Sequence, residues 1–150
     1  MTVFRRCSLL LAASVLACSA DTVVGPGGRF DHALARSVCG PADGAALAIY
    51  LSTDPIPSEE PSGEFVQVFI DGPSEQLLGQ RLPIGSPSIV SATYNWGGAK
   101  FELARSGYVT LNSGSEGNGL EGSVDLQFPS AGRVHGAFHS EWLPNVAGCA

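Results

Sequence analysis

Apolar and polar residues alternate with a period of two along most of the chain from Ala45 onward. This period is typical of strands that bury one face of a sheet, whereas a helix has a period of 3.6. The expected strands cover residues 45–52, 64–71, 89–96, 100–104, 108–112, 120–128 and 133–142, and an eighth is indicated over residues 77–83. Short strands separated by turn residues predict an all-β fold, an antiparallel β-sandwich or barrel of about seven to eight short strands.

The hairpin formed by residues 120–128 and 133–142 has a register that parity restricts, because directly opposed residues must share a face of the sheet. A loop of three residues places Asp125 opposite His135. The same loop places Glu121 opposite His139. A loop of five residues or a bulge at Gly132 also satisfies the parity, so these alternatives stay open.

Two further features concern how the strands are buried. Residues 45–52 are apolar almost throughout, as in a strand that is covered on both faces. Gly122 and Gly136 fall on the buried face of the last hairpin, which indicates a bend of the sheet or the close packing of a large neighbour.

The composition limits the function classes that are open to this chain. Hydrophobic residues make up 44% of its 150 residues, which excludes wholesale disorder. The formal net charge of −6 argues against a nucleic-acid partner, which requires a basic surface. The chain contains no run of 18 or more apolar residues, so no membrane-spanning helix is expected.

The first residues have the organisation of a signal peptide. Arg5 and Arg6 precede an apolar stretch of ten residues, 8–17, which is too short to span a bilayer. The stretch ends in Val15-Leu16-Ala17-Cys18, which resembles the lipobox of bacterial lipoproteins. The expected signal peptide is therefore residues 1–17.

This resemblance implies an anchor in the membrane. The Cys18 thiol would receive a diacylglycerol, the signal would be cut before Cys18, and the new amine would often be acylated. One acyl chain anchors a protein only marginally, whereas two or three hold it stably. Ser19, rather than Asp, follows the cysteine, which in a cell with two membranes implies the outer membrane. The expected location is the bacterial cell envelope, and the alternative is a secreted protein cut near Ala17 or Ala20.

Removal of the signal would change the charge of the chain. The mature protein would keep all 14 acidic residues and six of the eight basic ones, giving a net charge of −8. Anionic headgroups would repel such a body, so we expect it to stand off the membrane surface.

The four cysteines support an extracytoplasmic location. Cys7 would leave with the signal and Cys18 would carry the lipid, so Cys39 and Cys149 remain for a disulfide in an oxidising compartment. Closing a loop of this length stabilises a fold by about 4–5 kcal/mol in the chain-entropy model. A metal site or a catalytic thiol is the alternative, but neither cysteine has neighbours at ligand spacing.

Between the signal and the body, the sequence predicts a flexible segment. Residues 19–28 end in Gly-Pro-Gly-Gly and show no amphipathic period. Residues 30–38 form the one stretch with a plausible helical turn, with Asp31 as its N-cap. The expected division is thus a lipidated cysteine and tether over residues 18–38 and a single all-β domain over residues 39–150.

Two clusters of side chains, one of carboxylates and histidines and one of carboxylates alone, are candidates for metal binding. The outward face of the last hairpin carries Glu121, Asp125, His135, His139 and Glu141. The two histidines are four residues apart on one strand, roughly 13 Å, which is too far to share an ion, so solvated cross-strand pairs are the expected arrangement.

The second group is the acidic, Pro-rich loop of residues 54–64. Asp54, Glu59 and Glu60 could offer oxygens to Ca²⁺, but the spacing of an EF-hand is missing and a solvated connection is expected instead. No metal and no cofactor are expected at either place.

Exposed aromatic rings could stack on a sugar or an apolar ligand. Aromatic residues occur at Tyr94, Trp96, Phe101, Tyr108 and Trp142, and on alternating strands such rings are more often core. Trp96, beside the Gly97-Gly98 turn, is the candidate for the rim of a ligand site. The chain has no G-x-S-x-G motif and no phosphate-binding loop, so no enzymatic activity is expected.

The strand pattern from Leu77 to Trp142, including the stretches 106–111 and 122–128, is also similar to small β domains of bacterial lipoproteins of unknown function. The leading hypothesis is a lipid-anchored envelope β-domain with a structural or protein-interaction role. The alternative is a ligand-binding module for a small apolar molecule or glycan. A closed barrel with a cavity favours the alternative, and a filled core favours the leading hypothesis.

Overall fold

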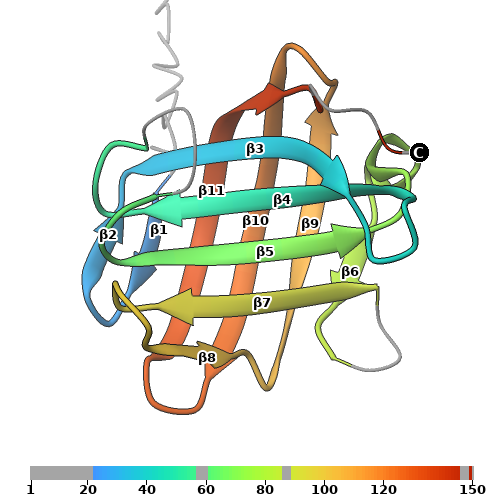
Figure 1. The fold of residues 1–150 in the computed structure, drawn as a ribbon. Coiled ribbons are helices and arrows are strands. Elements are labelled where there is room, and N and C mark those ends of the chain that lie inside the picture. Colours follow the sequence, from blue (N-terminus) through green and yellow to red (C-terminus); the bar gives the residue numbers. More distant parts are fainter. Residues whose placement is uncertain (1–21, 57–60, 86–88, 146–148, 150) are drawn as a thin grey trace, which may run out of the picture.

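The structure is a computed structural model that describes residues 22–56, 61–85, 89–145 and 149. The described residues form eleven strands, which belong to one curled sheet, and one short 3₁₀ helix (Figure 1). The elements are β1 (Val23–Gly25), β2 (Gly28–Phe30), β3 (His32–Cys39), β4 (Ala45–Ser52), β5 (Phe65–Asp71), η1 (Ser74–Leu77), β6 (Arg81–Pro83), β7 (Val90–Asn95), β8 (Phe101–Leu103), β9 (Ser106–Gly114), β10 (Gly119–Phe128) and β11 (Gly132–Leu143). The predicted all-β class is confirmed, and no helix in these ranges is long and apolar enough to cross a bilayer.

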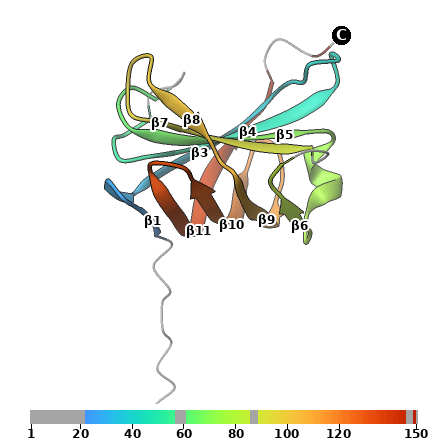
Figure 2. The same ribbon diagram turned by 90° about the horizontal axis from the view of Figure 1, so that it is seen from below.

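The sheet folds back on itself as a half-barrel of two layers. Its strand order is β6-β9-β10-β11-β3-β4-β5-β7-β8. In Figure 1 the strands β9, β10 and β11 run across the strands β3, β4, β5 and β7, and Figure 2 shows the two layers edge-on. Inward-facing side chains from both layers can therefore share one core.

Strand β11 joins the two layers. Its first part pairs with β10 from Gly132 to Glu141, and its end pairs with β3, the one parallel pairing among the described strands. Trp142 lies opposite Ala35 in this parallel segment and is buried. The twelve residues of β11 thus carry the chain from one layer into the other.

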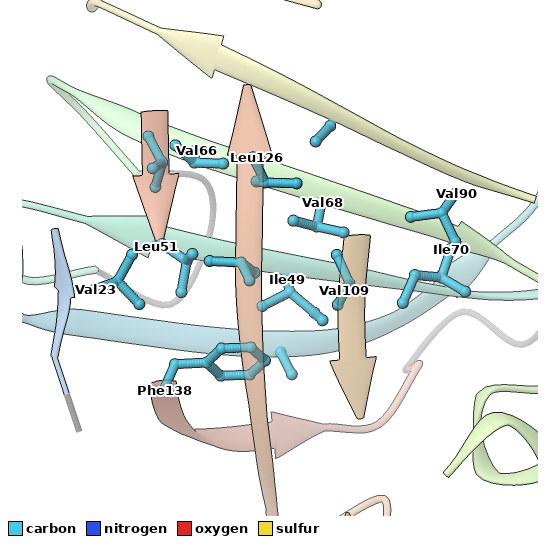
Figure 3. Close-up of a cluster of buried hydrophobic side chains, with 14 of the residues drawn as sticks. Val23, Ile49, Leu51, Val66, Val68, Ile70, Val90, Val109, Leu126 and Phe138 are labelled. Atoms are coloured by element: carbon cyan, nitrogen blue, oxygen red, sulfur yellow. The ribbon is translucent and has the colours of Figure 1, made fainter. Parts of the chain in front are cut away.

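The core is filled by side chains from both layers. Figure 3 shows Ile49, Val68, Val109 and Leu126 pointing toward one another from β4, β5, β9 and β10. Strand β4 is buried from Ala46 to Ser52, as its apolar sequence predicts. Among the described residues, the interior between the two layers is therefore filled by apolar side chains, as in a sandwich.

The last hairpin has the three-residue loop. Phe128 pairs with Gly132, so the loop consists of residues 129–131. Asp125 lies opposite His135 and Glu121 opposite His139, which confirms the register that parity allowed.

Both buried glycines of this hairpin mark close approaches, as predicted. A Cβ atom on Gly122 would lie 2.6 Å from the Phe138 ring. Gly136 has a φ of +144°, and a Cβ atom there would lie 2.1 Å from the carbonyl oxygen of Thr22, where β1 pairs with β11. Either position would clash with any larger residue.

The predicted tether was wrong for the described residues up to Val38. These residues form β1, β2 and β3, and the helical turn expected over residues 30–38 is strand instead. β3 pairs with β4 along its whole length, from His32 opposite Ser52 to Cys39 opposite Ala45. Pairing with an apolar strand outweighs the weak local preference of a short segment.

The predicted eighth strand is shorter than expected. Of residues 77–83, only Arg81–Pro83 form a strand, at the edge next to β9. Leu77 is the last residue of η1, and residues 78 and 79 form a turn.

Candidate functional site

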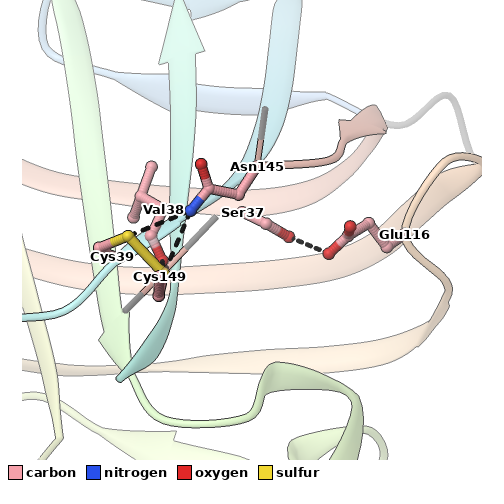
Figure 4. Close-up of a disulfide and its surroundings, with 6 residues drawn as sticks. All are labelled: Ser37, Val38, Cys39, Glu116, Asn145 and Cys149. Atoms are coloured by element: carbon pink, nitrogen blue, oxygen red, sulfur yellow. Dashed lines mark hydrogen bonds between the residues drawn. A yellow bond between two sulfur atoms is a disulfide. The ribbon is translucent and has the colours of Figure 1, made fainter. Parts of the chain in front are cut away.

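The Cys39–Cys149 disulfide is present, as the cysteine pattern predicts (Figure 4). The two cysteines are 110 residues apart and their Cα atoms are 5.3 Å apart. The Asn145 side-chain nitrogen lies 3.2 Å from the Cys39 sulfur and 3.1 Å from the Cys149 sulfur. The bond therefore fixes the C-terminal part of the chain to the end of β3.

A chain of hydrogen bonds lies next to the disulfide. The Trp142 indole N–H donates to the Ser37 hydroxyl at 2.9 Å. The Ser37 hydroxyl in turn donates to a carboxylate oxygen of Glu116, which belongs to the loop between β9 and β10 (Figure 4). These bonds position a carboxylate at the same end of the molecule as the disulfide.

The opposite end of β3 is closed by aromatic rings. Tyr94 is fully buried, with its ring centroid 6.2 Å from that of Phe30, 5.4 Å from that of Phe128 and 4.9 Å from that of Trp96. The register aligns Tyr94 with Val66 on β5, Leu51 on β4 and Ala33 near the start of β3. This aromatic end cluster, Phe30, Tyr94, Trp96 and Phe128, fills the end of the half-barrel.

The Tyr94 hydroxyl has a charged partner. It donates to a carboxylate oxygen of Glu64. Burial of the phenol, together with the Glu64 carboxylate, raises the pKa of Tyr94 far above its ordinary value. The phenol therefore stays neutral and acts as a donor, so it has no features of a general base.

Trp96, the predicted rim residue, is the partly buried member of this cluster. The Lys100 ammonium lies 4.4 Å from the centroid of the Trp96 ring. A ligand that stacked on this ring would compete with that cation–π contact. A ligand rim at Trp96 stays a prediction.

Strand β8 has its polar and apolar faces reversed. Phe101 and Leu103 point outward, with 65% and 60% of their surface exposed, although the sequence pattern favoured the core for Phe101. Glu102 points inward opposite Tyr94, and its carboxylate accepts hydrogen bonds from the N–H groups of Ser130 and Ala131 at 2.6–3.1 Å. An inward carboxylate that satisfies backbone N–H groups of a turn forces its two apolar neighbours outward.

The turn at Ser130 and Ala131 lowers the pKa of the Glu102 carboxyl group. Burial raises the pKa of Glu102, but the hydrogen bonds from Ala131 and Ser130 lower it by more, so the net pKa lies below its ordinary value. The group is thus ionised at neutral pH and stabilises the hairpin turn.

The exposed apolar side chains of β8 continue a surface of the neighbouring strands. Phe101 lies beside Asn95, which is opposite Phe65, and Leu103 lies in the row of Tyr50. The Tyr50 and Phe65 ring centroids are 6.1 Å apart. We call Phe65, Phe101 and Leu103 the outer apolar patch, which the sequence alone did not indicate. Tyr50 beside it is buried, with 6% of its surface exposed.

The acidic and histidine residues of the last hairpin form separate pairs. Arg133 donates two hydrogen bonds to Asp125, at 2.8 and 3.0 Å, and holds the pKa of that carboxyl below its usual range. His139 Nδ1 lies 3.7 Å from a carboxylate oxygen of Glu121. Among the described residues no three His, Cys, Asp or Glu side chains are grouped as metal ligands.

Several predicted sites lie outside the described residues. These are Cys18 and the signal peptide, together with Glu59 and Glu60 of the acidic loop. Searches of protein-family models, curated proteins and solved structures found no match to this chain. The chemistry of its own residues therefore carries the functional argument.

Proposed function

We propose that this chain is a non-enzymatic, lipid-anchored protein of the bacterial cell envelope that binds a partner protein through the outer apolar patch. The observation that carries the proposal is the reversed strand β8, which exposes Phe101 and Leu103 to water. Contiguous exposed apolar surface is typical of interaction sites, and aromatic residues dominate the energetic centres of such interfaces.

The filled interior supports an interaction role over a ligand carrier. The largest fully buried side chains, among them Trp142, Tyr94 and Phe128, occupy the space that a lipocalin-like barrel would leave for a ligand. We therefore expect the domain to bind other molecules on its surface and not in its interior.

The position of β8 in the sheet also suits a partner protein. Among the described strands it pairs with β7 alone, so its other edge has no strand beside it. Strand edges bind extended segments of other proteins, and every second side chain of such a segment would lie on the same face as Phe101 and Leu103. A partner with an extended apolar segment fits this edge.

The anchor at Cys18 would hold the body close to the membrane. The described chain starts at Thr22, four residues after Cys18, and β1 starts at Val23. Four residues span at most about 14 Å, so the body would have little freedom to move away from the bilayer surface. This short reach replaces the long tether that the sequence predicted.

The anchor is tested by metabolic labelling with an alkyne fatty acid in a bacterial host. The wild-type protein should take up the label and enter the detergent phase on detergent partitioning, and Cys18→Ser should do neither. Cys7→Ser is the matched control, because that cysteine would be removed with the signal. Equal labelling of Cys18→Ser would overturn the lipoprotein assignment.

The partner is tested by placing a photo-crosslinking amino acid at position 101 in living cells. We expect a discrete covalent adduct that disappears when Leu103→Ser is added. Val24, which is 38% exposed on β1, provides the control position and should give no such adduct. The absence of an adduct at position 101, or an adduct with the mass of two copies of this chain, contradicts a distinct partner protein.

A further inference from the structure

A groove of about 390 Å³ lies at the disulfide end of the molecule, on a different part of the surface from the outer apolar patch. Its apolar wall consists of Val38 from the end of β3, Ala45 and Ala46 from the start of β4, and Pro73 just before η1. The Trp142 side chain and the disulfide-bonded Cys149 also line it. Its volume is in the range of sites for small molecules.

The charged groups among the described lining residues of the groove are both acidic, and its other polar residues are neutral. Glu75, in η1, and Glu116, in the loop between β9 and β10, both line it, and neither forms an ion pair with another described residue. None of the lining residues that the structure describes is Lys, Arg or His. The groove therefore combines an apolar wall with uncompensated negative charge.

Glu116 is also held in place. Its carboxylate accepts the hydrogen bond of the Ser37 hydroxyl, whose own position is fixed by the Trp142 indole. Because Trp142 is buried in the parallel segment of β11, this chain of bonds ties the carboxylate to the core. A carboxylate fixed in advance loses little side-chain entropy when a ligand binds.

We propose that this groove binds a small organic cation, an ammonium or guanidinium group attached to an apolar body. The apolar body would lie against Val38, Ala46 and Pro73, and the cationic group would pair with Glu116 and Glu75. A divalent metal does not fit as well, because the described residues offer no three ligands at one point. The proposal does not depend on the partner protein proposed above.

The groove lies at the end of β3 that is distant from β1. In Figure 1, β1 lies on the left and the end of β3 lies on the right. If the chain is anchored ahead of β1, the groove and the anchor therefore lie at different ends of the body.

The test uses three probes with one apolar body and three charges: 4-phenylbutylamine, 4-phenylbutanol and 4-phenylbutanoate. Binding to the oxidised protein is followed by NMR, with chemical shifts at Val38, Ala46 and Trp142 as the readout. We expect the amine to bind about five- to tenfold more tightly than the alcohol, since each partly exposed ion pair contributes up to about a fivefold change. The carboxylate should bind more weakly than either.

Variants separate the groove from the general acidity of the protein. Glu116→Gln should weaken the amine several-fold and leave the alcohol unchanged. Glu121→Gln removes the same charge on the outer face of β10 and should leave the amine affinity unchanged. If Glu116→Gln does not fold, Glu75→Gln provides the same comparison at the second carboxylate of the groove. The probe series on the wild-type protein tests the proposal without any variant.

Three results would overturn the proposal. The carboxylate could bind as tightly as the amine, Glu121→Gln could weaken the amine as much as Glu116→Gln does, or the shifts could appear away from the groove. A control titration in about 1 M NaCl, where the Debye length is about 3 Å, should bring the amine close to the alcohol.

Discussion

The two ends of β3 are closed in different ways. At its last residue the Cys39–Cys149 disulfide holds the C-terminal part of the chain, and a groove lies beside it. Near its first residues the aromatic end cluster closes the half-barrel through ring contacts and the Tyr94–Glu64 hydrogen bond. A hollow of about 380 Å³ also lies near the first residues of β3, where His32 and Leu34 line it. The difference between the two ends is therefore how each is held, by a covalent bond at one end and by the packing of aromatic rings at the other.

The largest expected effect comes from removing the covalent bond. Cys39→Ser combined with Cys149→Ser should lower the free energy of unfolding by about 4–5 kcal/mol, because the disulfide closes a loop of about 110 residues. Urea unfolding of the oxidised protein and of the double variant measures this loss. Equal stability of the two proteins would show that packing, rather than the disulfide, holds that end.

The packed end is tested by Tyr94→Phe. We expect a loss of about 1.5–3 kcal/mol, since the change removes a buried hydrogen bond to a carboxylate while keeping the ring. A loss of less than about 1 kcal/mol would contradict the importance of the Tyr94–Glu64 pair.

The same pair should make the stability depend on pH. Since folding raises the pKa of Tyr94, its contribution is complete below about pH 10, the ordinary value, and is lost as the pH rises further. The difference in unfolding free energy between the wild type and Tyr94→Phe should therefore shrink above pH 10. A difference that stayed constant to pH 12 would exclude this linkage.

A smaller effect is expected at the turn beside the packed end. Glu102→Gln should speed hydrogen exchange at the N–H groups of Ser130 and Ala131, because a neutral amide accepts these bonds more weakly than a carboxylate. Because folding lowers the pKa of Glu102, its contribution is present at neutral pH and is lost as the pH falls below its ordinary value. In the wild type, exchange at these two sites relative to the rest of the hairpin should rise on acidification. Unchanged hydrogen exchange in the variant would mean that Glu102 does not stabilise the turn.

The smallest effect is expected for the exposed Asp125–Arg133 pair, which belongs to the surface of the last hairpin and not to the packing of either end. Asp125→Asn should lower the melting temperature less than any change above, and the remaining effect should fall in about 1 M NaCl. Thermal melts at low and high salt measure this. A loss as large as that of Tyr94→Phe would mean that surface pairing matters as much as the packing of an end.

Much of the layer that contains β4, β5 and β7, and much of the last hairpin, could be predicted from the sequence. The alternation over β5, β7, β10 and β11 marked the buried faces, and the apolar run of β4 marked a strand covered on both faces. The parity of the last loop left a few possible registers, and the structure has the one with the three-residue loop. Both buried glycines were placed correctly as close approaches. These features depend on residues that are near one another in sequence, so the local pattern contains them.

Other features escaped the sequence because distant partners decide them. Residues 30–38 have no strong pattern of their own, and they become β3 through β4 on one side and β11 on the other. Phe101 faces water because Glu102 is needed beneath the turn at Ser130. The one signal available was parity: Trp96 and Lys100 pair across the Gly97-Gly98 turn, which places Glu102 rather than Phe101 opposite the inward Tyr94.

The sequence by itself determined the all-β class, the buried faces of the main strands and the pairing of Cys39 with Cys149, since periodicity and cysteine count are properties of the chain alone. The tertiary structure decided that the segment before Cys39 is sheet, that β8 faces outward and that Glu75 and Glu116 share a groove. These depend on which surfaces meet when two layers cross, and the free energy of that contact outweighs local preference wherever the local pattern is weak.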